Sequence, residues 1–487
     1  MKIKLCIFLL LLFGCMSKIK SPPIATIKPH ELTMHGDTRI DNYYWMRLTD
    51  EQKKAEKYDE QAQEVVDYIS EENKYTQSNL SHTTKLQETL YDEIVSRIKK
   101  DDKSVPYYKN GYYYYSRYEK NKEYRIHCRK EGSLEADEEI ILDENKLAEG
   151  HDYFAVGGRV VSPDNNWLAF GVDTVSRRIY DIYFKNLKTG KVISQTISNS
   201  TGSVAWANDN KTVFYTSKNQ TTLLGEKIWR HKVGEKSNDK LMYHEKDDTF
   251  YNGVYKSKSG KFIIIYHSST LISDYQILNA DNPDGTFKRF TPRDFNHEYS
   301  IDHFDDKFYI ITNWKAENNR LMETSDQKTS ISNWKEVISH RKDVHLLSME
   351  IFTNHLVISE RKNGLRELRI INQGSGEDSY IDFGEDTYTS WISVNEEFNT
   401  NLLRYTFSSL TTPFSTYDYN MDTKKLDLKK RDEVVGGYDS NKYASERMYA
   451  TARDGKTIPI SLVYRKDKKL NQPQNLLLYA YGAYGST

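Results

Sequence analysis

The 487-residue sequence predicts a mainly β protein, in which a seven-bladed β-propeller lies between a helical segment and the start of an α/β sheet. Three observations predict this order. Apolar residues first recur at helical spacing, then short β-rich runs repeat at an even interval, and a last apolar run is typical of a strand buried on both faces. Because 13% of the residues are aromatic, and tyrosine dominates them, strands are favoured over a helical bundle.

The overall charge is balanced. The chain has 69 Lys and Arg residues against 70 Asp and Glu residues, so its formal net charge is -1. This balance gives no general attraction to nucleic acid, which we therefore do not expect as a partner. The 13 histidines show no H-E-x-x-H or paired-ligand spacing, so neither a metal site nor a cofactor is expected.

The N-terminus has the pattern of a secretory signal peptide. In "MKIKLCIFLLLLFGC", residues 1–15, two lysines precede an apolar core that is too short to span a membrane. The ending "LFGC" resembles a bacterial lipobox, in which Cys15 would be lipidated and become the new N-terminus. Phe13 is larger than the residue usual at its position, so simple signal cleavage further along is the alternative. We expect an exported, periplasmic or cell-envelope lipoprotein that a lipid anchor holds at a membrane surface.

The remaining cysteine predicts no catalysis. Cys6 and Cys15 belong to the predicted leader, so Cys128 would be alone in the mature chain and could form no intrachain disulfide. Within "RIHCRK" it is expected to be a strand residue. His127 beside it forms no dyad with it, because adjacent strand residues point to opposite faces.

Residues 22–100 are predicted to form a helical segment. After a proline-containing extended arm, residues 51–76 and 83–100 place apolar residues at helical spacing among charges, which predicts two amphipathic helices. We expect the apolar stripes to make core contacts rather than membrane or partner contacts. The stripes consist of Val65, Tyr68, Ile69, Leu86, Leu90, Ile94 and Ile98.

Residues 101–425 are predicted to form the propeller. Seven β-rich runs recur at steps of 56, 45, 49, 46, 48 and 47 residues, and turn formers precede several of them. Such a period, with several strands in each unit, is typical of a β-propeller, whereas two stacked β-sandwiches would need no even repeat. The runs are centred near Tyr112, Leu168, Val213, Phe262, Phe308, Leu356 and Leu403.

Residues 426–487 are predicted to begin an α/β domain. Asp454 and Gly455 lie between two alternating runs, which predicts a hairpin with Ile458, Ile460, Leu462 and Tyr464 on one face. The run "NLLLYAY", residues 475–481, is apolar at both parities and is predicted to be a strand covered on both sides.

Several stretches resemble the prolyl oligopeptidase family of serine peptidases, and most closely its oligopeptidase B branch. The resemblance extends from about residue 24 to the C-terminus. Where the family tends to have Asp-Pro-Tyr-x-Trp, this chain has Asn42 in place of the proline. The matching stretches include "DNYYWMR" (41–47), "EENKYT" (71–76), "SERMYATARDGKTIPISLVYRKD" (445–467) and "YAYGAYGS" (479–486).

The resemblance implies an architecture and a substrate class. In this family an N-terminal piece packs with a C-terminal α/β-hydrolase domain, and the propeller inserted between them caps the active site. Only short or flexible peptides are admitted, so short peptides are the implied partners. Members similar to oligopeptidase B cleave after Lys or Arg, and the prolyl branch cleaves after Pro.

The resemblance also places the catalytic residues. A serine hydrolase of this type needs G-x-S-x-G, then an acid and a His, and the sequence contains no G-x-S-x-G. All three catalytic residues are therefore expected beyond Thr487, so the chain is expected to be C-terminally incomplete and inactive alone. A non-catalytic peptide-binding propeller and a prolyl-specific peptidase are the alternatives.

One catalytic element is expected within the chain. By resemblance, Tyr481 would donate its hydroxyl to the oxyanion of the tetrahedral intermediate, a contribution of about 3 kcal/mol for one such donor. Tyr484 corresponds to the family's aromatic residue that lines the substrate pocket. The alternative interpretation is a tyrosine-rich strand end whose hydroxyls reach solvent.

Overall fold

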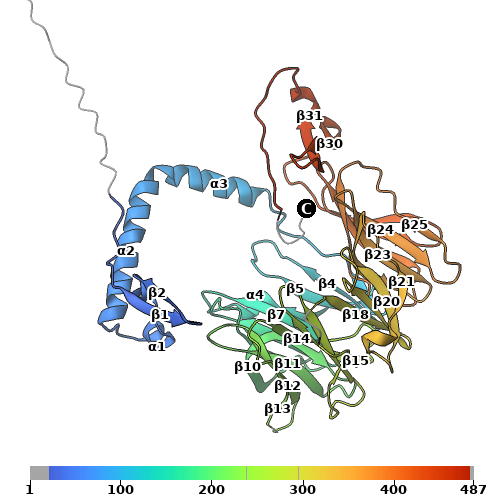
Figure 1. Cartoon of the computed structure of the whole chain (residues 1–487), viewed down its shortest axis with the longest axis horizontal. Helices are drawn as coiled ribbons and strands as arrows, with labels where there is room; N and C mark the ends of the chain where they lie inside the picture. Colours follow the sequence, from blue (N-terminus) through green and yellow to red (C-terminus); the bar gives the residue numbers. More distant parts are fainter. Residues whose placement is uncertain (1–20, 237, 294–295, 483–487) are drawn as a thin grey trace, which may run out of the picture. The chain divides into compact units, whose positions relative to one another are not determined.

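The computed structural model describes residues 21–236, 238–293 and 296–482 (Figure 1). The predicted signal peptide, with Cys15, and the predicted pocket residue Tyr484 lie outside the described residues. The chain divides into two compact units, Met1–Ile98 and Lys99–Thr487. The division falls within two residues of the predicted end of the helical segment.

The first unit contains a hairpin and the predicted helices. The Asp59 side chain caps the long helix by accepting a 2.8 Å hydrogen bond from the backbone N–H of Ala62. Both predicted amphipathic helices are present, and a third, short helix precedes them in the chain. The elements are β1 (His30–Met34), β2 (Asp37–Asp41), η1 (Tyr44–Met46), α1 (Asp50–Lys54), α2 (Glu60–Leu80), η2 (Ser81–Thr83) and α3 (Thr84–Ser96).

The apolar stripes of these two helices differ in how far they are buried. On α2, Val65 is buried as predicted. The prediction of core contacts was wrong for Ile69 of α2, which is 51% exposed, and for the whole second stripe, since Leu86, Leu90, Ile94 and Ile98 are 46–62% exposed. The buried residues of this unit lie in η1 and at the start of α2, so its small core does not reach α3.

The second unit contains a β-propeller, as predicted. Its described strands form five separate four-stranded sheets and one seven-stranded sheet. The four-stranded sheets are β3 (Tyr107–Lys109), β4 (Tyr112–Arg117), β5 (Ile126–Glu131), β6 (Glu139–Asp143); β14 (Tyr251–Lys256), β15 (Phe262–Ser268), β16 (Ser273–Asn279), β17 (Lys288–Arg289); β18 (Tyr299–Phe304), β19 (Lys307–Thr312), β20 (Arg320–Ser325), β21 (Lys335–Ile338); β22 (Val344–Ile351), β23 (His355–Lys362), β24 (Leu365–Asn372), β25 (Asp378–Tyr380); and β26 (Tyr388–Ile392), β27 (Leu402–Ser409), β28 (Ser415–Asn420), β29 (Leu426–Arg431).

The seven-stranded sheet explains why separate sheets are fewer than predicted blades. Its central strand, β10, is 15 residues long: its first part pairs with β9, and after a register shift at Ser200–Val204 it pairs with β11. Two blades are therefore joined through one continuous strand, where a loop between them was expected. We number the two halves of this sheet as blades 2 and 3 of the seven blades. Its strands are β7 (Ala155–Val161), β8 (Trp167–Asp173), β9 (Tyr180–Asn186), β10 (Val192–Trp206), β11 (Thr212–Lys218), β12 (Gly225–Lys232) and β13 (Lys240–His244).

The repeat read from the sequence corresponds to one strand position. All seven predicted runs lie on the second strand of a blade, namely on β4, β8, β11, β15, β19, β23 and β27. The predicted end of the propeller at residue 425 falls one strand short, because β29 completes the last blade after it. That strand, "LDLKKR", is polar and mostly exposed, so its sequence carries little strand signal.

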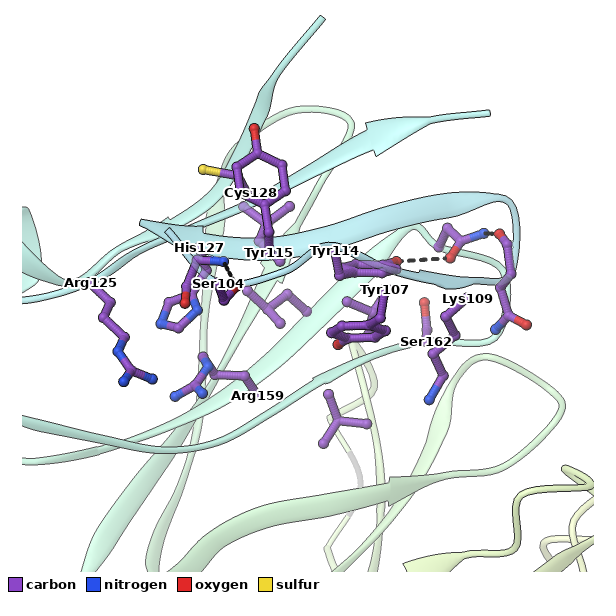
Figure 2. A pocket seen from close by; sticks show the side chains of 17 residues that line it. Ser104, Tyr107, Lys109, Tyr114, Tyr115, Arg125, His127, Cys128, Arg159 and Ser162 are labelled. Atoms are coloured by element: carbon purple, nitrogen blue, oxygen red, sulfur yellow. Dashed lines mark hydrogen bonds between the residues drawn. The ribbon is translucent and has the colours of Figure 1, made fainter. Parts of the chain in front are cut away.

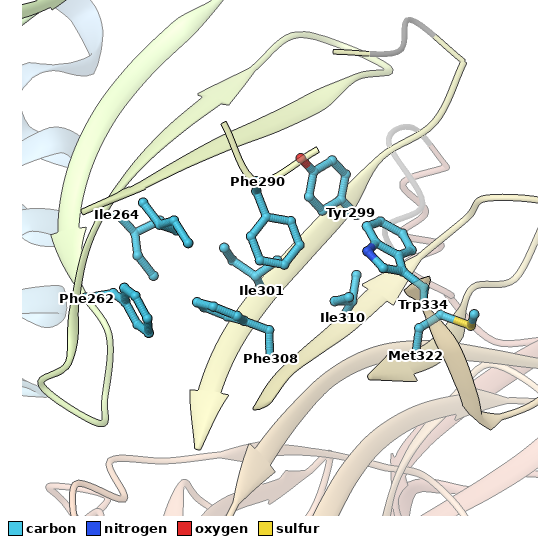
Figure 3. Close-up of a cluster of buried hydrophobic side chains, with 10 residues drawn as sticks. Phe262, Ile264, Phe290, Tyr299, Ile301, Phe308, Ile310, Met322 and Trp334 are labelled. Carbon is cyan, nitrogen blue, oxygen red and sulfur yellow. The ribbon is translucent and has the colours of Figure 1, made fainter. Parts of the chain in front are cut away.

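Apolar side chains join each blade to the next along the chain. Figure 3 shows the cluster between blades 4 and 5, in which Phe262 and Ile264 of β15 pack with Phe308 and Ile310 of β19 around Phe290. The ring centroids of Phe262 and Phe308 are 5.1 Å apart. Five further clusters join blades 1 and 2, 2 and 3, 3 and 4, 5 and 6, and 6 and 7. Blade-to-blade packing is thus the core of the propeller.

The C-terminal hairpin is present, but the strand predicted after it is not. β30 (Tyr443–Thr451) and β31 (Thr457–Arg465) pair with each other around the predicted Asp454–Gly455 turn. Residues 475–482 form no strand, and Leu477 is 91% exposed. A strand buried on both faces needs neighbouring strands and covering helices, and the described residues supply none beside this run. Within the described part of the chain, no helix is both long and apolar enough to cross a bilayer.

One glycine lies where two strands of the seven-stranded sheet approach closely. A Cβ atom added at Gly171 of β8 would lie 2.5 Å from the Cα and carbonyl oxygen of Gly202 in β10. Backbone atoms cannot rotate away as the end of a side chain can. At Gly374, in the loop after β24, the nearest atom to an added Cβ is 3.4 Å away, which is ordinary contact.

We therefore expect Gly171→Ala to destabilise the propeller by about 1–3 kcal/mol, since overpacking forces the backbone to shift. Urea denaturation of the purified chain, followed by tyrosine and tryptophan fluorescence, measures this loss. Gly374→Ala is the matched control and should change the free energy of unfolding little. Equal stabilities of the two variants would contradict the close approach of β8 and β10.

Candidate functional site

Side chains from blades that are not neighbours meet at one place in the propeller. Lys258, in the turn after β14 of blade 4, donates hydrogen bonds to Glu350 Oε1 at 2.5 Å and to the Ile351 carbonyl at 2.9 Å, both on β22 of blade 6. Blade 5 lies between these blades in chain order. Contacts that skip a blade can form only where the first strands of the blades converge, so this place lies at the propeller axis.

We call this group the axial cluster, and it combines charge with aromatic rings. The Lys258 ammonium group lies 4.9 Å from the ring centroid of Phe352 and 4.4 Å from that of Phe398, and its side chain is only 11% exposed. Burial raises the pKa of Asp302, and it also raises that of Glu350, which the charge of Lys258 opposes. The cluster consists of Lys109, Asn208, Lys256, Lys258, Asp302, Glu350 and Glu396, with Phe352 and Phe398.

The other half of the axial cluster connects blades 1, 3, 4 and 7. Lys256, the last residue of β14, donates a 2.5 Å hydrogen bond to Asn208 Oδ1. Burial lowers the pKa of Lys256 to about 8, and the positive charge of Lys109 on blade 1 contributes to this fall. Lys109 Nζ in turn lies 2.8 Å from Glu396 Oε2 of blade 7. The centre of this face is therefore occupied by paired, partly buried charges.

Blades 7 and 1 are joined by polar contacts. Arg404 donates a 2.6 Å hydrogen bond to the Pro106 carbonyl, and Lys430 Nζ lies 2.6 Å from Asp102 Oδ2. The six apolar clusters of the described residues include none between these two blades. The ring of blades is thus closed by ion pairs and hydrogen bonds at one junction only.

One set of contacts superficially suggests a serine triad. Ser259 Oγ lies 2.8 Å from His303 Nδ1, and His303 Nε2 lies 3.8 Å from Asp326 Oδ2. His303 is 1% exposed and packs between aromatic rings, and its burial lowers its pKa to about 4. A base with this pKa accepts protons poorly at neutral pH, and the serine lies in a hairpin turn rather than on the sharp strand-to-helix turn of a nucleophile. We assign these residues a structural role.

The residues predicted from the sequence lie apart from the axial cluster. Tyr481 is 57% exposed in the segment without strand structure, so its oxyanion role stays a prediction. Cys128 is fully buried, and burial raises the pKa of its thiol to about 12, which agrees with the predicted strand role. His127 Nε2 pairs with Glu144 Oε1 at 2.6 Å rather than with the thiol. Among the described residues, no His, Cys, Asp and Glu side chains form a group of three or more that could hold a metal ion.

Sequence reasoning missed the axial cluster. The turn "KSKSGK", residues 256–261, carries three lysines between two apolar strands, and this concentration of charge was the available signal. The partners of these lysines, such as Glu350, lie about 90 residues further along the chain, as the sequence separation of 92 shows. No local pattern connects such residues.

Known proteins match most of this chain. The family model "Prolyl oligopeptidase, N-terminal beta-propeller domain" matches residues 22–432. Dipeptidyl aminopeptidase BI of Pseudoxanthomonas mexicana is 39% identical over 96% of this chain and 66% of the relative. Protease 2 of Moraxella lacunata is 32% identical over 95% of this chain and 66% of the relative. The chain thus spans just under two thirds of the length of these relatives.

A solved structure shows the same fold. Oligopeptidase B from Trypanosoma brucei, in a closed form with covalently bound antipain, superposes with a TM-score of 0.83 at 30% identity. The match covers 96% of this chain and 68% of that one. Together with the family model that matches residues 22–432, this likeness shows that the chain belongs to the prolyl oligopeptidase family of serine peptidases.

Proposed function

We propose that this chain belongs to a serine-type oligopeptidase that cleaves short peptides after Lys or Arg, and that its propeller controls the access of substrates to the active site. The observation that supports this most directly is the match to the family's propeller over residues 22–432. The 32% identity to Protease 2 and the likeness to oligopeptidase B favour cleavage after basic residues over cleavage after proline.

The axial cluster supports a role of the propeller in selecting substrates by size. Lys258, Glu350 and the neighbouring rings occupy the centre of one face, and the blades around them are joined by close-packed apolar clusters. A rigid ring whose centre is lined by these side chains would exclude folded proteins. Short, flexible peptides are the substrates that such a ring would admit.

A second candidate activity is the removal of dipeptides from a free N-terminus. The 39% identity to a protein named dipeptidyl aminopeptidase BI favours it. The two activities differ in one requirement: an oligopeptidase cleaves a reporter whose N-terminus is blocked, whereas a dipeptidyl aminopeptidase needs the free amine two residues before the cleaved bond.

We expect the purified 487-residue chain to show no peptidase activity, because its sequence contains no G-x-S-x-G to supply the nucleophile. Fluorogenic reporters ending in Arg, Lys or Pro, each with a free and with a blocked N-terminus, measure this directly. An organophosphorus probe that labels active serines provides a second readout. Turnover or labelling by the pure chain would refute the proposed location of the catalytic residues.

We further expect the coding sequence after codon 487 to hold a reading frame with G-x-S-x-G and a later His. The product of that longer frame should cleave blocked Arg and Lys reporters at least about tenfold faster than Pro reporters. Cleavage of unblocked reporters alone would establish the dipeptidyl activity instead. Absence of the motif from every downstream frame would refute the peptidase proposal for this gene.

The N-terminal sequence supports an exported, lipid-anchored protein. "LFGC" at residues 12–15 places Cys15 where a lipoprotein would receive its lipid. An N-terminal cysteine that carries several acyl chains anchors stably to a bilayer, whereas one chain binds only reversibly. We therefore propose that the protein is attached to a membrane of the cell envelope.

We expect Cys15→Ser to abolish incorporation of an alkyne-labelled fatty acid and to shift the protein from the membrane fraction to the soluble one. Cys128→Ser is the matched control, and it should leave labelling unchanged because this thiol is buried. An unlabelled wild-type protein, or equal labelling of wild type and Cys15→Ser, would refute the lipid anchor and favour simple signal cleavage.

A further inference from the structure

A cavity of about 250 Å³ lies between blades 1 and 2. Strands β3, β4 and β5 supply one wall, and β7 and β8 supply the other (Figure 2). All of its lining residues belong to the propeller.

The lining is positively charged in a chain whose overall charge is balanced. It contains Lys109, Arg125 and Arg159, and none of the lining residues that the structure describes is Asp or Glu. Two carboxylates stand just behind these cations: Glu396 pairs with Lys109 at 2.8 Å, and Glu144 lies 3.7 Å from Arg159 Nη1. A third carboxylate, Asp164, accepts a hydrogen bond from Ser162 of the lining, so the cations outnumber the carboxylates only within the lining itself.

The two guanidinium groups retain free donors. Arg125 Nε donates to the Tyr118 hydroxyl at 3.0 Å, and among the described residues it pairs with no carboxylate. Arg159 Nη1 makes only a long hydrogen bond of 3.4 Å to the Gly157 carbonyl and the 3.7 Å contact with Glu144. Figure 2 shows both side chains directed to the same end of the cavity, beside His127. A pair of guanidinium groups with free N–H donors suits a planar carboxylate.

The rest of the lining is aromatic and aliphatic. The rings of Tyr107 and Tyr114 stack with their centroids 5.7 Å apart, and Val160 and Leu168 come from the opposite blade. Burial raises the pKa of Tyr107 to about 12, so its hydroxyl stays protonated at neutral pH and can donate a hydrogen bond. The cavity thus offers a cationic end and an apolar body.

We propose that this cavity binds a small monocarboxylate with an apolar body, of the size of an N-acylated amino acid or the C-terminal residue of a short peptide. The carboxylate lies between Arg125 and Arg159 and accepts hydrogen bonds from their guanidinium groups. The apolar body lies against Tyr107, Tyr114 and Leu168. A volume of about 250 Å³ is slightly smaller than that of most ligand pockets, which fits one residue rather than an extended peptide.

Isothermal titration of the purified chain tests the ligand class with three probes. N-acetylleucine carries the carboxylate and the apolar body, N-acetylleucinamide lacks the charge, and inorganic phosphate lacks the apolar body. We expect binding of N-acetylleucine at least about tenfold tighter than that of either other probe, as for the loss of a charge-assisted hydrogen bond. Equal binding of the amide, equal binding of phosphate, or no binding of N-acetylleucine would each overturn the proposal.

Variants locate the binding. Arg159→Gln and Arg125→Gln should each raise the dissociation constant of N-acetylleucine about tenfold or more and leave the far-UV circular dichroism unchanged. Because Arg125 is exposed and, among the described residues, its side chain has Tyr118 as its only polar or ring partner, its replacement tests the site even if the Arg159 variant folds poorly. Arg177→Gln, on the same blade as Arg159 but outside the cavity, is the matched control. Unchanged affinity in the Arg125 variant would refute the site.

Discussion

Face-to-face packing of neighbouring blades is the constraint on which the rest of the second unit depends. Strand β15 shows how it works: Phe262 and Ile264 pack toward blade 5, whereas Ile263 and Ile265 pack toward blade 3. Because side chains alternate along a strand, a blade covered on both faces needs apolar residues at both parities. In blades that are packed on both faces, this demand makes the second strand a continuous apolar run. Blades 2 to 6 each pack against two neighbours in this way, whereas blades 1 and 7 each have one apolar junction.

The same demand explains what could be predicted from the sequence. The propeller and the positions of the seven runs follow from the even recurrence of these β-rich second strands. The merger of blades 2 and 3 was missed because Asn199 to Gly202 look like a turn, yet β10 continues through them with a register shift. The stripe on α3 and the run 475–481 show a second limit. An apolar pattern indicates that a face packs against some partner. It does not identify that partner or show that it lies among the described residues.

The axial cluster was unpredictable for a different reason. Lys258 and Glu350 meet because the first strands of separate blades converge, and their sequence separation of 92 residues leaves no local trace. A buried ion pair of this kind adds little net stability, since desolvation of both charges offsets their attraction. Removing one partner, however, leaves a buried charge alone. The pair therefore fixes the relative positions of blades 4 and 6, and with Lys109 and Lys256 it makes the centre of the propeller polar in a molecule whose blade junctions are apolar.

The junction between blades 7 and 1 gives the ring a mechanical asymmetry. Six junctions depend on apolar burial, which excluded salts such as sulfate strengthen. The seventh depends on the Arg404 hydrogen bond to Pro106 and on the partly exposed ion pairs of Lys430 and Lys109, which are screened as the ionic strength rises. An increase in the concentration of such a salt thus strengthens the six apolar junctions and weakens the polar one. In concentrated salt we therefore expect the junction between blades 7 and 1 to open more readily than the other six, so that the ring would open there first.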